Sequence, residues 1–342
     1  MVQNMRKMNR KKESRILLPL LLILNVLLWG SALYLWLQDT DVPPQTTTNF
    51  ATAAEINAPT PPQPPVQSAD FHDSSALTYA DVTVQIYSNH ALLVNLDTGE
   101  ILFDHRGGER AYPASVTKIM TVLVGLEHAR SDELTVYFDP DALFQASATM
   151  TGFVVGETRT LSEVLHASML DSGGDATTTL AYHVAGSYQG FVDLMNETAM
   201  RLGMHDTHFT NASGLHDDDH YTTAYDTALL LSYALTHPYF REIFTAPTYT
   251  FINSEGHEQL MQSTMFRNMP TPVFNQGEIL GGKTGFTTPA GLCLASIATD
   301  GVHEFALITF AAYTEDSPPM ANVLDAFAIY DYFFDLENDA GE

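Results

Sequence analysis

The chain has 342 residues, of which 15 are Lys or Arg and 41 are Asp or Glu, so its formal net charge at pH 7 is −26. A surface with this excess of negative charge repels nucleic acid, and we expect no DNA or RNA partner. The single cysteine, Cys293, excludes a disulfide within the chain and a zinc site built on cysteines.

The N-terminal part has the composition of a membrane anchor followed by a spacer. Residues 1–15 are basic, and residues 16–37 are an uncharged apolar run, long enough to cross a hydrocarbon core of about 30 Å as a helix. The positive-inside rule then places residues 1–15 in the cytoplasm and the rest outside, as a single-pass cell-membrane protein. Cleavage as a signal peptide, which would secrete the protein, is the alternative. Residues 38–80, rich in Pro and Thr, predict an extended linker.

Residues 81–336 have the pattern of one α+β domain, with an acidic tail at 337–342. Two strands are predicted near its start and three near its end, at 82–96, 100–105, 283–287, 291–298 and 304–312. Helical periodicity dominates between them, at 115–129, 161–170, 175–186, 191–203 and 224–235, and a last helix is predicted near 319–334. We therefore expect an antiparallel five-stranded sheet, closed by both ends of the domain and flanked by helices, with an inserted helical lobe.

Lysine is scarce beyond residue 15, where only Lys118 and Lys283 occur. Lys118 follows Ser115 by three residues, and Pro113 places this serine in the first turn of a helix, where the helix dipole favours developing negative charge. The following run I-M-T-V-L-V-G-L is apolar on nearly every side and predicts a buried central helix. A lysine on such a helix is desolvated, and its neutral amine can take the proton of the Ser115 hydroxyl.

Two further motifs follow. D-S-G-G-D, which contains Ser172, predicts a loop between two helices. G-G-K-T-G opens a strand with Lys283, Thr284 and Gly285, where the lysine and threonine can bind a carboxylate. We expect Gly285 to let a substrate backbone approach closely.

In this order the three motifs resemble those of the penicillin-recognising serine acyl-enzymes. The sequence from 175 to 231 is similar to the helical region of one branch, the serine-type D-alanyl-D-alanine carboxypeptidases among the low-molecular-mass penicillin-binding proteins. The likeness extends over about residues 83–334. It implies a β-lactamase/DD-peptidase-like fold, peptidoglycan stem peptides as substrates, β-lactams as covalent inhibitors, and neither a cofactor nor a metal.

The resemblance also implies roles for individual residues. Ser115 would be the acylated nucleophile, Lys118 its proton acceptor, and Ser172 a proton relay to the leaving group. Lys283 would bind the terminal carboxylate with help from Thr284. One position departs from the family: where members usually carry Ser-Gly-Asn-Asp, this chain has glycine as the third residue. The asparagine would have bonded the substrate amide, and its loss is expected to cost roughly 1–3 kcal/mol.

Several alternatives are open at this stage. H-D-T-H (205–208) and H-D-D-D-H (216–220) are dense in metal-binding residue types, but the H-E-x-x-H motif of metallopeptidases is absent from the sequence. A β-lactamase, a DD-endopeptidase and a catalytically weakened penicillin-binding homologue with a scaffolding role are the others.

Overall fold

The computed structural model describes residues 71, 76–78, 81–137, 148–269, 271–312 and 317–341, which all belong to one compact unit, Thr60–Glu342. The predicted anchor at 16–37 lies outside these residues, as does nearly all of the predicted linker. Among the described residues, no helix combines the length and the apolar character that a membrane span requires.

The described secondary structure follows the predicted order of strands, helices and strands. Its elements are β1 (Leu77–Thr78), β2 (His90–Asn95), β3 (Ile101–His105), the 3-10 helix η1 (Ala114–Thr117), α2 (Lys118–His128), β4 (Glu133–Thr135), β5 (Thr158–Thr160), α4 (Leu161–Met169), α5 (Gly174–Ala185), α6 (Tyr188–Arg201), α7 (Ala224–Leu235), α8 (Pro238–Thr245), β6 (Thr248–Ile252), β7 (Glu258–Gln262), the 3-10 helix η2 (Phe266–Asn268), β8 (Val273–Phe274), β9 (Gly277–Thr287), β10 (Gly291–Thr299), β11 (Glu304–Ala312) and α9 (Ala321–Gly341).

The main sheet has the strand order β1-β3-β2-β11-β10-β9-β8. Its five inner strands are the predicted ones, and all pair antiparallel. The pairing of β2 with β11 joins the two ends of the domain, as expected. The predicted number of strands was too small, because two-residue strands extend both edges, β1 parallel to β3 and β8 antiparallel to β9. Strands this short carry no alternation of polar and apolar residues, so no sequence pattern indicated them.

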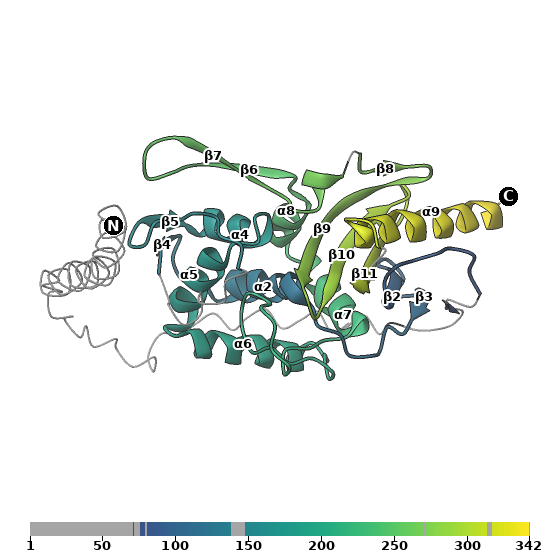
Figure 1. The fold of residues 1–342 in the computed structure, drawn as a ribbon, viewed down its shortest axis with the longest axis horizontal. Coiled ribbons are helices and arrows are strands. Elements are labelled where there is room, and N and C mark those ends of the chain that lie inside the picture. Colours follow the sequence, from purple (N-terminus) through teal and green to yellow (C-terminus); the bar gives the residue numbers. More distant parts are fainter. Residues whose placement is uncertain are drawn as a thin grey trace, which may run out of the picture. The chain divides into compact units, whose positions relative to one another are not determined.

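Helices cover both faces of the sheet. The C-terminal helix α9 packs on one face against β9, β10 and β11, whereas α7 packs on the opposite face against β2, β10 and β11 (Figure 1). Strands β10 and β11 are consequently buried almost throughout. Because both faces of these strands are buried, their sequences are continuous apolar runs and do not alternate between polar and apolar residues. Helix α9 continues to Gly341, into the segment assigned to the acidic tail.

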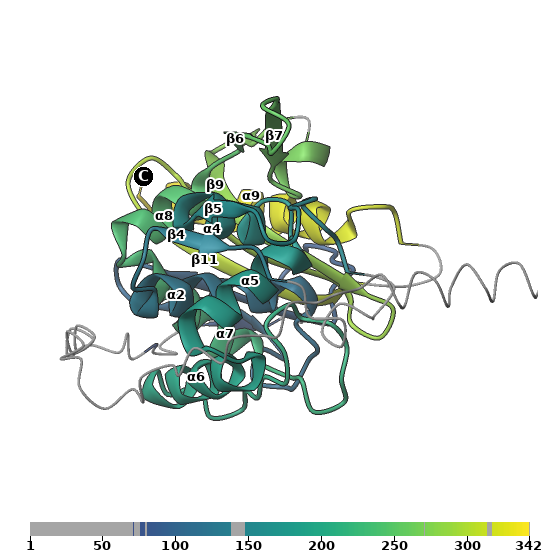
Figure 2. The ribbon, with the colours of Figure 1, turned by 90° about the vertical axis from the view of Figure 1, so that its left-hand side faces the viewer.

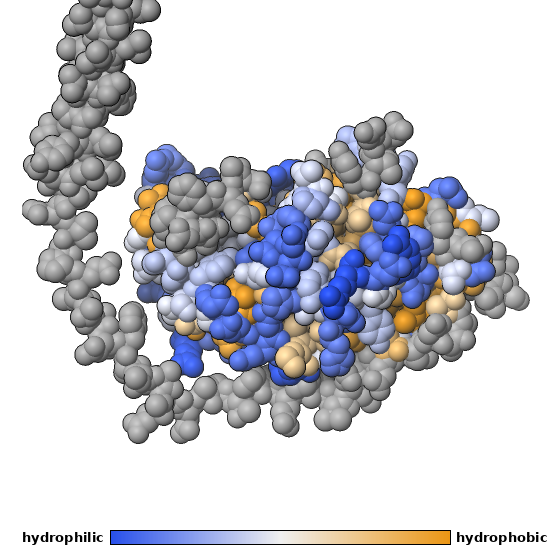
Figure 3. Space-filling view, turned by 60° about the horizontal axis from the view of Figure 1, so that its bottom comes forward, coloured by the Kyte–Doolittle hydropathy of each residue, from blue (hydrophilic) through white to orange (hydrophobic). Residues whose placement is uncertain are grey.

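The inserted lobe surrounds α2, the central helix of the domain. Helices α4, α5, α6, α7 and α8 all pack against it, and Figure 2 shows α5 and α7 beside it. Every residue from Lys118 to Gly125 is buried, which confirms the predicted central helix. Helix α8 and the hairpins β4–β5 and β6–β7 were not predicted, because each is short and partly exposed. On the face in Figure 3 hydrophilic residues predominate among the coloured ones, in keeping with the acidic composition.

Candidate active site

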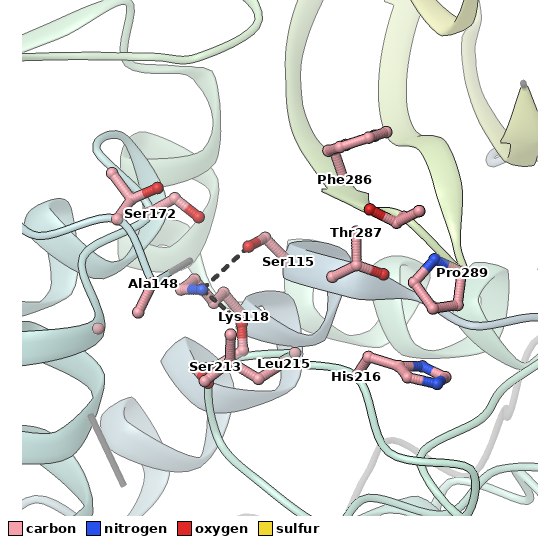
Figure 4. A pocket seen from close by; sticks show the side chains of 14 residues that line it. Ser115, Lys118, Ala148, Ser172, Ser213, Leu215, His216, Phe286, Thr287 and Pro289 are labelled. Carbon is pink, nitrogen blue, oxygen red and sulfur yellow. Dashed lines mark hydrogen bonds between the residues drawn. The ribbon is translucent and has the colours of Figure 1, made fainter. Parts of the chain in front are cut away.

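The first motif forms a hydrogen-bonded pair at the start of α2. Ser115 belongs to η1 and Lys118 is the first residue of α2. The Nζ of Lys118 donates to Ser115 Oγ over 3.1 Å and to the carbonyl oxygen of Ser213 over 2.5 Å (Figure 4). Side chains three residues apart eclipse each other in a 3-10 helix, which explains how the lysine reaches the serine. The predicted contact between these two side chains is confirmed.

Two glycines allow neighbouring segments to pack directly against the backbone of η1. A side chain at Gly214 would lie 1.9 Å from the carbonyl oxygen of Ala114, and one at Gly285 would lie 2.8 Å from the backbone nitrogen of Ser115. Ala114 itself has a positive φ of 46°, an uncommon backbone conformation for alanine. The side-chain space at Gly285 is therefore taken up by η1, whereas we predicted that a substrate would use it.

Ser172 lies across from Ser115, in the loop between α4 and α5 (Figure 4). Its φ is 60°, in the left-handed region, and its Oγ is buried without a hydrogen-bond partner among the described residues. Strained backbone and an unpaired buried hydroxyl both cost free energy, and such costs cluster at functional sites. The structure thus brings the second predicted serine to the same cleft, with a hydroxyl available for a ligand.

The cleft consists of two adjoining pockets of about 300 and 330 Å³. Both are lined by Ser115, Thr149, Ser172 and Phe286. The first pocket also includes Lys118, Gly174, Ser213, Leu215, His216 and Thr287, and the second includes Thr264, Thr284, Leu292, Met320 and Val323. Figure 4 shows Ser115 between Ser172 on one side and Phe286 and Thr287 on the other.

Burial controls the charge of the two lysines beside the cleft. Lys118 is 2% exposed and Lys283 is 1% exposed. Desolvation, and after it the positive charge of Lys283, hold the pKa of Lys118 well below its ordinary value, while the charge of Asp175 opposes this shift. Desolvation also lowers the pKa of Lys283 to about 7, with Asp171 acting in the opposite direction. The environment therefore favours the neutral amine that a base requires.

The third motif lies on β9, and its residues differ in access to the cleft. Thr284 lines the second pocket, and its Oγ1 shares a hydrogen bond of 2.6 Å with Thr264 Oγ1. The ammonium of Lys283 donates to the backbone oxygen of Thr284 over 3.1 Å and lies below the cleft surface. Lys283 lowers the pKa of Lys118 by its charge, and its predicted contact with a substrate carboxylate stays a prediction.

One histidine of the second histidine-rich stretch, His220, contacts the 3-10 helix that carries Ser115. His220 accepts a hydrogen bond from the backbone N–H of Thr210 at Nδ1, which leaves Nε2 to donate to Thr117 Oγ1 in η1 over 2.8 Å. Burial lowers the pKa of His220 to about 3, so the ring is neutral. Within the described part of the chain, no three His, Cys, Asp or Glu side chains gather closely enough to hold a metal ion.

The sequence profile of the D-alanyl-D-alanine carboxypeptidase family, peptidase S11, matches residues 76–314. The chain belongs to this family. It is 32% identical to D-alanyl-D-alanine carboxypeptidase DacF of Bacillus subtilis over 248 residues, which are 70% of this chain and 62% of DacF. It is 29% identical to DacA of Escherichia coli over 247 residues, 69% of this chain and 59% of DacA. The chain thus spans about three fifths of these relatives.

Two solved structures share the fold. The D-alanyl-D-alanine carboxypeptidase of Mycobacterium tuberculosis superposes with a TM-score of 0.66 at 26% identity, over 76% of this chain and 96% of that chain. The Streptomyces K15 DD-transpeptidase gives a TM-score of 0.65 at 25% identity, over 74% of this chain and 99% of that chain. These similarities confirm the predicted fold class.

Sequence patterns did not single out Asn211, which orders the turn that contacts Lys118 in this member of the S11 family. Asn211 Oδ1 accepts hydrogen bonds from the backbone N–H groups of Ser213, Gly214 and Leu215. This compact turn presents the Ser213 carbonyl oxygen to Lys118 Nζ. An asparagine two residues before Ser-Gly is a turn signal of the Asx type, and it could have been noticed. That this turn lies beside α2 could not be predicted from the sequence, because it depends on how the two segments pack in the tertiary structure.

Proposed function

We propose that the chain removes the terminal D-Ala from D-Ala-D-Ala peptidoglycan stem peptides through an acyl-enzyme on Ser115. Membership of the S11 family and the names of the relatives support this activity. The observation that carries it is the 3.1 Å contact between Ser115 Oγ and a fully buried lysine amine. A nucleophile in contact with its base is the arrangement that acyl transfer requires.

The first half-reaction forms an ester on the enzyme. Ser115 Oγ attacks the carbonyl carbon of the penultimate D-Ala while its proton passes to the neutral Nζ of Lys118. Negative charge develops on the carbonyl oxygen, which the backbone N–H groups at the start of η1 stabilise. The peptide C–N bond then breaks, and the unpaired hydroxyl of Ser172 relays the proton held on Lys118 Nζ to the departing nitrogen, which leaves Lys118 neutral. Free D-Ala leaves, and Ser115 carries the shortened peptide.

The second half-reaction restores the enzyme. A water molecule attacks the ester carbonyl and gives a proton to Lys118 Nζ. The C–O bond to Ser115 breaks, the proton returns to Ser115 Oγ, and the peptide departs with a new carboxylate. A β-lactam acylates Ser115 by the same attack on its ring amide, but its leaving nitrogen stays tethered to the acyl group.

We further propose that the domain works outside the cell, anchored by residues 16–37 and spaced from the bilayer by residues 38–80. The uncharged apolar run and the basic segment before it support this location. Secretion after cleavage is the alternative, and N-terminal sequencing of the native protein separates the two.

One observation favours an alternative function. The family asparagine is replaced by Gly174, which lines the cleft without a side chain. A catalytically weakened penicillin-binding homologue would acylate on Ser115 and turn over peptide poorly. Release of D-Ala, measured beside acylation, distinguishes the two functions.

A fluorescent penicillin tests the nucleophile. The full-length chain in detergent should be labelled once, on the tryptic peptide that contains Ser115, and Ser115→Ala should abolish the labelling. Ser131→Ala removes an exposed serine outside the cleft and serves as the control, with labelling unchanged. Undiminished labelling of the Ser115→Ala protein contradicts the mechanism. Labelling without release of D-Ala from an acetylated D-Ala-D-Ala tripeptide supports the weakened homologue.

A further inference from the structure

The glycine at the second motif leaves a gap in the recognition of the peptide. Gly174 is the first residue of α5, is buried at the backbone and lines the first pocket. Its φ is not positive, so its backbone conformation does not demand glycine. If the chain hydrolyses D-Ala-D-Ala peptides as proposed, another group has to hold the amide that an asparagine side chain would have held.

Thr149 is the side chain best placed for this task. It lines both pockets together with Ser115 and Ser172, so it lies where the two halves of the cleft meet. Its backbone oxygen accepts a hydrogen bond of 2.7 Å from the N–H of Gly174. Its side chain is exposed, and its hydroxyl makes no hydrogen bond to any residue that the structure describes.

The segment that carries Thr149 is held firmly against the start of α5. The carboxylate of Asp175 accepts hydrogen bonds of 2.9–3.0 Å from the N–H groups of Thr151, Gly152 and Phe153. Gln259 donates from β7 to the Thr151 oxygen over 3.0 Å. The segment packs so closely that a side chain at position 173 would lie 2.2 Å from Thr151 Oγ1. A hydroxyl on such a segment is preorganised for a ligand.

We propose that the Thr149 hydroxyl binds the backbone amide of the D-Ala-terminated peptide in place of the missing asparagine. A hydroxyl is both a donor and an acceptor, so it can replace either half of a side-chain amide. Thr149 is then a substrate-binding residue, and Gly174 provides the room for the peptide to reach it. This proposal rests on the proposed carboxypeptidase function.

The test compares Thr149→Val with Thr151→Val in the full-length chain in detergent. Valine keeps the shape of threonine and removes the hydroxyl. Thr149→Val should lower kcat/KM for an acetylated D-Ala-D-Ala tripeptide about tenfold, which corresponds to about 1.4 kcal/mol. Thr149→Ser should restore most of it. Thr151→Val removes a buried, unpartnered hydroxyl from the same segment and should stay within twofold of the wild type.

A rescue variant distinguishes a binding contact from a loss of structure. In the Thr149→Val background, Gly174→Asn should recover kcat/KM, because the asparagine amide returns the contact. Endpoint labelling with fluorescent penicillin should be complete in every variant, which shows that the Ser115 machinery is intact. Wild-type kcat/KM in Thr149→Val, or failure of Gly174→Asn to rescue, would overturn the proposal. Absence of labelling or peptide hydrolysis in the wild type would instead refute the proposed function.

Discussion

Lys118 at the start of α2 and Lys283 on β9 share nearly complete burial but differ in their contacts. Lys118 lines the cleft and donates hydrogen bonds to both Ser115 Oγ and the Ser213 carbonyl oxygen. Lys283 bonds only the adjacent backbone oxygen of Thr284 among the described residues, and it lies beneath the cleft surface. Both amines have lowered pKa values, and desolvation is the largest cause in each.

The comparison shows that a lowered pKa does not by itself identify the base. Desolvation makes both lysines easier to deprotonate, but only Lys118 has its amine within hydrogen-bonding distance of a nucleophile. A base must first be in contact with the proton that it takes, and only then does its pKa matter. Lys283 contributes a charge that lowers the pKa of its neighbour.

Replacing each lysine by arginine should have the largest effect. Arginine keeps the positive charge but stays protonated, so it cannot accept the Ser115 proton. Lys118→Arg should reduce the penicillin acylation rate by roughly 10²–10⁴-fold, the usual contribution of general-base catalysis. Lys283→Arg is the matched control, because it keeps a cation at an equally buried position, and it should retain measurable acylation. A near-normal rate in Lys118→Arg, followed over time, would exclude Lys118 as the base.

The second prediction concerns the contact between β9 and η1. In Gly285→Ala, the new methyl group would lie 2.8 Å from the Ser115 nitrogen and 3.0 Å from the Pro113 oxygen. Because both neighbours are backbone atoms, η1 has to shift, and the acylation rate should fall on the order of 10²-fold, as displacements of reacting groups do. The control is Gly108→Ala, where a methyl group meets nothing within 4 Å. Equal rates in the two variants would show that η1 tolerates displacement.

The smallest effect is expected in the pH dependence. In the proposed mechanism Lys118 reacts as the neutral amine, so acylation should increase as pH rises through its lowered pKa. Lys283, with a pKa of about 7, loses its charge above that pH. Because a neutral amine no longer attracts the terminal carboxylate that Lys283 is predicted to bind, peptide kcat/KM should then decline. The negative charge of Asp171 raises the Lys283 pKa. Asp171→Asn should therefore move the alkaline decline to lower pH.

The control for this shift is Asp193→Asn, which removes one exposed carboxylate and changes the net charge equally. Full pH profiles of kcat/KM for the tripeptide, measured for the three proteins, provide the comparison. If the alkaline decline in kcat/KM occurs at the same pH in Asp171→Asn as in the wild type, Lys283 does not cause that decline.

Local patterns were sufficient for the inner strands, for the lobe helices α4, α5, α6 and α7, and for the contact between Ser115 and Lys118. Each depends on residues close together in the chain: a nearly uninterrupted apolar run for α2, Pro113 two residues before Ser115 for the helix start, and a separation of three residues for the Ser115–Lys118 pair. The similarity of the motifs to a known family also placed Ser172, Lys283 and Thr284 near one site, which the structure confirms for the cleft position of Ser172 and Thr284.

Other features of the site depend on contacts between segments that are distant in the sequence. Lys283 is buried beneath the cleft, Gly285 faces η1, and the Asn211 turn directs a carbonyl oxygen at Lys118. Thr149 reaches the site because Asp175 holds its segment from a position more than twenty residues further along the chain. No local pattern encodes these contacts, because burial, close approach and charge coupling depend on which surfaces pack together, and spacing along the chain does not specify that.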